Sequence, residues 1–183
     1  MTKPSVFICN ESEAAEVLEC FRSAADNYEP IVKRFVVHWH VHELPVLESP
    51  LRAVGSYFAQ LGMAPDRAGV LREIAVPAAY SIIGELLRYD LAREEELVSA
   101  EQAERCRNLV EQKSSDWAAY AFTNLSPLRV PGRLSVTFSP RTRVVRELDM
   151  EGGVILLGEQ DIAMIWFLED DSPSRGMLDL RYR

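Results

Sequence analysis

The beginning of the chain alternates short apolar runs with amphipathic segments. Ser5–Cys9 is predicted to form a first strand. Asn10 followed by Glu13 resembles a capping box, which predicts a helix through about Ala25. Residues 31–44 are predicted to form a second strand, because they are rich in β-branched and aromatic residues and end at a proline.

The middle of the chain repeats apolar residues at the three- and four-residue spacing of helices. Ser99 and Gln102 resemble a second capping box, and Pro77 suits the first turn of a helix. The predicted helices cover Leu51–Leu61, Arg67–Ala75, Pro77–Tyr89 and the segment from Ser99 to about Gln112.

From Ala118 onward the apolar pattern changes to a period of two, separated by Gly, Pro, Asn and Ser. Glu151-Gly152-Gly153 is predicted to be a tight turn between two of the strands. Ile162–Leu168 is apolar on both faces, which indicates a strand in the centre of a sheet. The predicted strands are Leu134–Phe138, Arg143–Met150, Val154–Leu157, Ile162–Leu168 and Leu178–Tyr182.

This order predicts an α+β fold in a single domain over residues 1–183. Residues 1–115 are helix-rich and 116–183 are β-rich, so we expect helices packed on a mainly antiparallel sheet. The sheet would combine a late meander of four or five strands with one or two early strands. A regular βαβ repetition is absent, which argues against a doubly wound sheet.

Composition narrows the classes of partner. The chain carries 28 acidic and 20 basic residues, a net charge of −8, which disfavours nucleic acid and anionic membranes and would attract a basic protein. A secretory signal, a membrane span and a disulfide framework are not indicated, because apolar runs are short and the three cysteines are an odd number. We therefore expect a cytoplasmic protein with reduced thiols.

All three histidines fall at alternate positions of one predicted strand, His38, His40 and His42. Successive side chains of a strand point to opposite faces, so the histidines would share one face while Val37, Trp39 and Val41 share the other. In one interpretation the imidazoles are neutral and face solvent or a helix. In others one of them acts as an acid or base, or the set forms a proton-sensitive interface.

A metal site is the sharper interpretation of the same residues. Two imidazoles at alternate positions can converge on one ion such as zinc, and His38, His40 and His42 are the candidate ligands. A carboxylate from Glu169, Asp170 or Asp171 would complete the set and leave a position for an activated water. Cys9 served by one of the histidines is a further candidate nucleophile, because such pairs leave no spacing signature.

Charge is sorted along the late part of the chain. Five arginines between 129 and 146 precede a run of acidic residues that reaches Asp171 without a base. The two runs would either form patches of opposite sign or pair across neighbouring strands. Glu94, Glu95 and Glu96 form a second acidic run, which would solvate a helix end or contact a basic partner.

The sequence favours a protein without catalysis over an enzyme. The motifs G-x-S-x-G, G-x-x-x-x-G-K-[ST], G-x-G-x-x-G and H-E-x-x-H are all absent. We predict a small acidic binding module with no cofactor, such as an inhibitor, immunity protein or antitoxin. The candidate partner-binding residues are Trp39, Glu94, Glu95, Glu96, Glu169, Asp170 and Asp171, with Trp117 and Trp166 as further anchors if exposed. Alternatives are a metal-dependent hydrolase built on the histidine strand and a subunit whose helices complete a larger complex.

Overall fold

The structure is a computed structural model that describes residues 7–25, 33–42, 49–63, 65–89, 96–127, 134–136 and 149–170. The helices within these ranges are α1 (Glu11–Ala25), α2 (Pro50–Gln60), the 3₁₀ helix η1 (Pro65–Val70), α3 (Val76–Arg88) and α4 (Ala100–Ser114). The strands are β1 (Phe7–Cys9), β2 (Lys33–His42), β3 (Arg72–Ile74), β4 (Tyr120–Thr123), β5 (Leu125–Pro127), β6 (Leu134–Val136), β7 (Asp149–Leu157) and β8 (Asp161–Asp170).

Six of the strands form one antiparallel sheet in the order β1-β2-β8-β7-β4-β3, while β5 and β6 pair separately. The long early strand β2 pairs with β8 along its whole length, from Lys33 opposite Glu169 to Val41 opposite Asp161. Helices therefore pack on a mainly antiparallel sheet that combines early and late strands. This confirms the predicted α+β fold.

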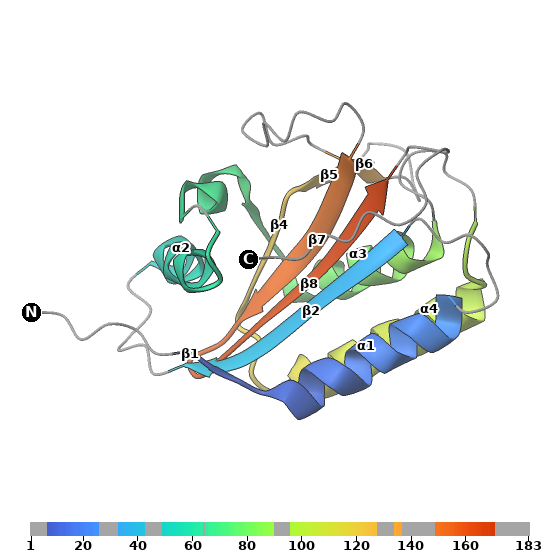
Figure 1. The fold of residues 1–183 in the computed structure, drawn as a ribbon, viewed down its shortest axis with the longest axis horizontal. Helices are drawn as coiled ribbons and strands as arrows, with labels where there is room; N and C mark the ends of the chain where they lie inside the picture. Colours follow the sequence, from blue (N-terminus) through green and yellow to red (C-terminus); the bar gives the residue numbers. More distant parts are fainter. Residues whose placement is uncertain are drawn as a thin grey trace, which may run out of the picture.

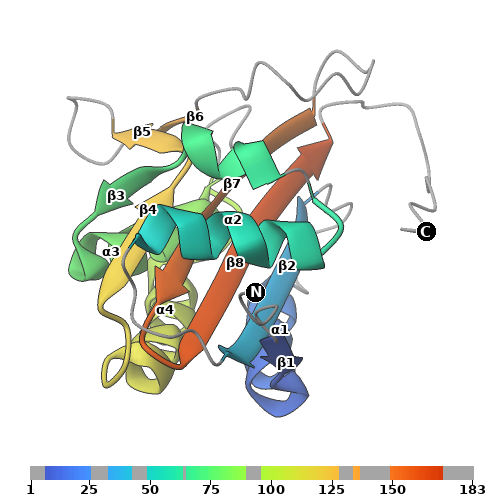
Figure 2. The same ribbon diagram turned by 90° about the vertical axis from the view of Figure 1, so that its left-hand side faces the viewer.

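Helices cover both faces of the sheet. Figure 1 shows α1, α3 and α4 on one side and α2 on the other, and Figure 2 shows α2 crossing β7, β8 and β2. The larger core lies under α1, α3 and α4, where Phe21, Leu87 and Phe167 are fully buried. The second lies under α2 and η1, where Tyr57, Phe58 and Met164 pack together. None of the described helices is both long enough and apolar enough to cross a membrane.

The central position predicted for Ile162–Leu168 is confirmed. These residues lie in β8, between β2 and β7, and from Ile162 to Phe167 they are all buried. Alternation sends Ile162, Met164 and Trp166 toward α2 and the residues between them toward the other helices. A strand with helices on both faces requires apolar residues at every position, as the sequence has here.

Helix α4 begins as its sequence predicts, because the Oγ of Ser99 accepts a hydrogen bond from the backbone N–H of Gln102 at 3.3 Å. Helix α1 also begins after Asn10, but without the reciprocal bonds of a capping box. The side chain of Asn10 accepts from the hydroxyl of Ser12, and the carboxylate of Glu13 lies against Lys113 of α4.

The helix predicted at Arg67–Ala75 is wrong. Its first part is the 3₁₀ helix η1, and Arg72–Ile74 is the edge strand β3, paired with β4. Ala75 is extended, with φ −65° and ψ 138°, because α3 starts directly after it with Pro77 in its first turn. Only a few residues remain between η1 and α3, and pairing with β4 provides hydrogen-bond partners for their backbone groups.

The turn predicted at Glu151-Gly152-Gly153 is also wrong, because β7 runs straight through it. Gly153 lies opposite Trp166 of β8, and a Cβ added there would collide with the indole and with the carbonyl oxygen of Ile165. Glycine is therefore required for close packing instead of for a turn. The chain turns at Gly158, whose N–H donates to the carbonyl of Asp161 at 2.8 Å. The strand predicted at Leu178–Tyr182 lies outside the described residues.

Candidate functional site

The histidines share one face of β2, as the alternation predicted. They lie on the side covered by α2, while Trp39 points to the other core and packs edge-on against Trp117 at 5.5 Å between ring centroids. His40 is 7% exposed, and its Nδ1 lies 2.9 Å from the hydroxyl oxygen of Tyr57 of α2. His42 is buried, and His38 is partly exposed with its ring 6.1 Å from that of His40.

Burial keeps these imidazoles neutral near neutral pH. It lowers the pKa of His38 and of His40, and the neighbouring charge of His38 lowers the pKa of His40 further. Burial also lowers the pKa of His42, partly offset by the backbone of Gly158 and the backbone and carboxylate of Asp161. The histidine face is thus a set of uncharged donors and acceptors.

The strand register separates the histidines from the late carboxylates. Glu169 pairs with Lys33, whereas His38 pairs with Met164, five residues further along β2, or about 16 Å at the rise of a strand. Asp170 ends β8 beyond Glu169, and Asp171 lies outside the described residues. In the described parts of the chain, no three His, Cys, Asp or Glu side chains are grouped to hold a metal ion. Among the side chains that the structure describes, the three histidines are therefore not joined by a further metal-ligating group.

The structure describes the side chains of only some of the predicted partner-binding residues. Trp39 is 1% exposed, so its side chain is not available to a partner, and Trp166 is also buried. Glu96 is exposed, and its carboxylate accepts a hydrogen bond from Nε of Arg88 at 2.8 Å. Glu94 and Glu95 lie outside the described residues, as do the five arginines between 129 and 146 whose pairing the sequence leaves open.

A different acidic surface is formed by α1 and α4, which lie side by side (Figure 1). Lys113 of α4 lies 2.5 Å from Glu13 and 2.6 Å from Glu16 of α1. We define the acidic helix surface as the charged residues of 11–25 and 100–116, which comprise eight carboxylates and four basic side chains. Its carboxylates are Glu11, Glu13, Glu16, Glu19, Glu101, Glu104, Glu111 and Asp116, all exposed or partly exposed. Half of the net charge of −8 therefore lies on this surface.

An exposed apolar pair borders the acidic helix surface. Ile8 of β1 lies opposite Val41 of β2, and the two side chains are 63% and 39% exposed. Asp161 follows opposite Val41 on β8, and its pKa is raised by burial and by the negative charge of Glu13 of α1. The apolar pair and the start of α1 thus belong to one end of the molecule.

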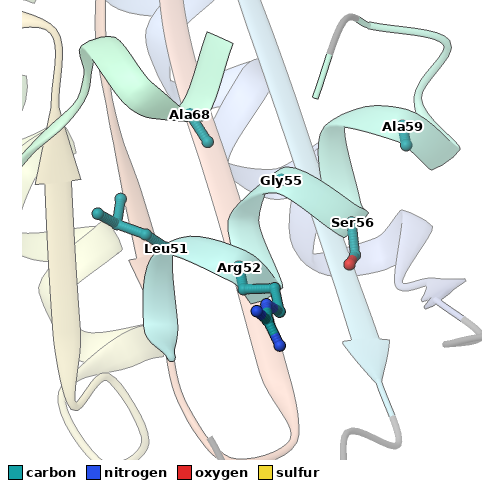
Figure 3. A pocket seen from close by; sticks show the side chains of 6 residues that line it. All are labelled: Leu51, Arg52, Gly55, Ser56, Ala59 and Ala68. Carbon is teal, nitrogen blue, oxygen red and sulfur yellow. The ribbon is translucent and has the colours of Figure 1, made fainter. Parts of the chain in front are cut away.

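A second surface feature is a hollow of about 380 Å³ on the solvent side of α2 (Figure 3). Most of the described residues that line it are small residues of α2 and η1, and Arg52 is the one charged residue among them. Its lining residues are Leu51, Arg52, Gly55, Ser56, Ala59 and Ala68. These residues offer neither a metal-ligating group nor an acid–base pair, so the hollow carries no chemistry of its own.

One cross-strand pair on the histidine face joins a thiol to an imidazole. Cys9 of β1 lies directly opposite His40 and on the same face of the sheet. The sequence suggested Cys9 with a histidine partner but gave no signal for which histidine. The sequence analysis missed Tyr57. The apolar spacing of a helix predicts that a tyrosine points inward, but it does not identify the hydrogen-bond partner of the hydroxyl.

Comparison of the chain with models of known protein families, with curated proteins and with solved structures gives no match. The function must therefore be argued from the site itself.

Proposed function

We propose that this protein is an acidic binding module that docks on a basic partner protein and inhibits or neutralises it without catalysis. The observation that carries the proposal is the acidic helix surface, which concentrates half of the net charge on two neighbouring helices and the two residues that follow α4. Such a field steers a basic partner and orients it during the encounter.

The acidic charge is available because only part of it is used internally. Glu13 and Glu16 share Lys113, and Glu104 lies 3.5 Å from Arg107. Within the described residues, Glu11, Glu19 and Glu101 have no ion-pair partner, and their side chains are exposed. Exposed carboxylates of this kind contribute little to folding and can be used for recognition.

The exposed pair Ile8 and Val41 supplies an apolar contact at the edge of this surface. Protein interfaces commonly combine an apolar centre with a charged rim, because desolvation of the centre provides affinity while the rim provides orientation. The proposed partner is therefore a protein with a basic surface and an apolar projection.

The test compares two variants with the same change in net charge. One is Glu19→Lys with Asp116→Lys on the acidic helix surface. The control is Glu73→Lys with Glu85→Lys on β3 and α3. Proteins captured from a lysate of the host by the unaltered chain are identified, and the association rate of each with both variants is measured at low and at physiological salt.

We expect the first variant to associate about ten-fold more slowly at low salt and the control to be nearly unchanged, with the difference shrinking as salt rises. Equal rates for the two variants with every captured protein would refute the electrostatic docking surface.

A further inference from the structure

His40 of β2 connects two other elements, because it is paired with Cys9 of β1 and hydrogen-bonded to Tyr57 of α2. The hydrogen-bond pattern between β1 and β2 shows how closely Cys9 and His40 approach each other. The N–H of Asn10 donates to the carbonyl of Trp39 at 2.7 Å, so the next pair along, Cys9 with His40, occupies a non-hydrogen-bonded position. At such positions the Cα atoms are about 4.5 Å apart and the side chains approach most closely.

His40 is hydrogen-bonded at one of its two ring nitrogens. Its Nδ1 is 2.9 Å from the hydroxyl of Tyr57, and its Nε2 has no hydrogen bond within the described residues. When Nδ1–H donates to the phenol oxygen, the lone pair is on Nε2, on the side of the ring away from Tyr57. The groups around His40 are Cys9 from β1, His38 and His42 on its own strand, Tyr57 from α2 and the apolar Ile162 from β8.

The three thiols of the chain differ sharply in access. Cys9 is exposed, whereas Cys106 is buried and donates its S–H to the carbonyl of Cys20 at 3.2 Å. Burial raises the pKa of Cys106, which keeps that thiol protonated and inert. Burial also raises the pKa of Tyr57, which keeps its phenol protonated.

We propose that Cys9 is a site of thiol–disulfide exchange with small disulfides, in which His40 is the base and Tyr57 positions His40. The sulfur of Cys9 attacks one sulfur of the disulfide while Nε2 of His40 takes the thiol proton. The old S–S bond breaks, a mixed disulfide forms on Cys9, and the leaving sulfur receives the proton from His40. Cys9 is thereby oxidised and half of the small disulfide is reduced to a thiol.

The geometry favours this reaction over acyl transfer. Exchange requires only an accessible thiol and a base, both of which are present. Acyl transfer also requires donors for an oxyanion, and the backbone N–H of Asn10, which follows the nucleophile, is already committed to Trp39.

The experiment uses glutathione disulfide as the probe on the intact chain. The initial rate of mixed-disulfide formation at each cysteine is measured by site-resolved mass spectrometry between about pH 6 and pH 8. The matched control is Cys9→Ser with Ile8→Cys, which moves the thiol by one residue to an exposed position opposite Val41 instead of His40.

We expect Cys9 to react about ten-fold faster than the thiol introduced at position 8 near pH 7. Its rate should also fall less steeply on acidification, because burial lowers the pKa of His40 and preserves the lone pair. His40→Gln should reduce the Cys9 rate to that of the control thiol. Tyr57→Phe should reduce it less and alter the pH profile, as expected for a positioning residue.

Equal rates at positions 9 and 8 across the pH range would overturn the proposal. That comparison leaves His40 and Tyr57 in place, so it remains decisive even if His40→Gln does not fold. A Cys9 rate that is unchanged in folded His40→Gln would overturn it independently, because an exposed thiol would then suffice.

Discussion

On one face of the sheet Phe167 packs against the rings of Phe21 and Phe35, with centroids 5.7 and 5.6 Å away, whereas on the other His40 is hydrogen-bonded to Tyr57. Both faces are covered by helices. One face is filled by closely packed apolar side chains, whereas the other contains buried polar groups that need hydrogen-bond partners. The first face therefore mainly stabilises the fold. The second face also packs, but it contains polar groups that can take part in a reaction.

The largest effect is expected when the apolar face is broken. Phe167→Ala should lower the free energy of unfolding by about 3–5 kcal/mol, because it removes a buried ring that packs against two others. Urea unfolding measures the loss. Leu51→Ala, at an exposed position of α2, serves as the control and should cost less than about 1 kcal/mol. Similar losses for the two would contradict the packing described for this core.

A smaller effect is expected on the polar face. Tyr57→Phe should cost about 1–3 kcal/mol, because it leaves the buried Nδ1 of His40 without its partner. The comparison is Tyr80→Phe under the other face. The hydroxyl of Tyr80 lies 3.0 Å from Oγ of Ser114, which also donates to the carbonyl of Val110. Ser114 keeps that bond, so Tyr80→Phe should cost less, and the reverse order in urea unfolding would contradict this contrast.

The smallest effect is the dependence of stability on pH. The pKa of each histidine is lowered in the folded protein, so the unfolded chain binds protons first as pH falls. Stability is fully present above the unfolded pKa of about 6.5 and is lost as pH falls from there toward the folded values. We expect a loss of about 1 kcal/mol between about pH 7 and pH 6, reduced in His38→Gln. Stability that rises in this window would exclude the assigned direction.

The sequence predicted the contrast between the faces only partially. The alternation in β2 placed the three histidines on one face and Trp39 on the other, and both placements are correct. Alternation cannot say which helix covers which face, and the histidine side lies beneath α2 in a sheet where β2 pairs with β8, more than a hundred residues later. The contact between His40 and Tyr57 depends on that pairing, so no local pattern encodes it.

The error in the secondary structure predicted at 67–75 has a physical cause. Apolar spacing at 67–75 fits a helix, but the edge of β4 offers backbone pairing to Arg72–Ile74 that a periodicity argument does not include. The acidic helix surface was missed for a related reason. The charges of α1 and α4 are far apart in the chain, and only the packing marked by Lys113 with Glu13 joins them.

The tight contact at Gly153 also bears on how the long hairpin of β7 and β8 chooses its alignment. A slip of one residue between β7 and β8 would turn every side chain of the slipped strand to the opposite face. That arrangement is unfavourable, because each core is packed around particular side chains. A slip of two keeps the faces, so the cores alone would tolerate it. Such a slip would place Glu151 or Ile155 opposite Trp166, where only a residue without a side chain fits. One missing Cβ thus selects a single alignment of the hairpin on which the whole sheet is assembled.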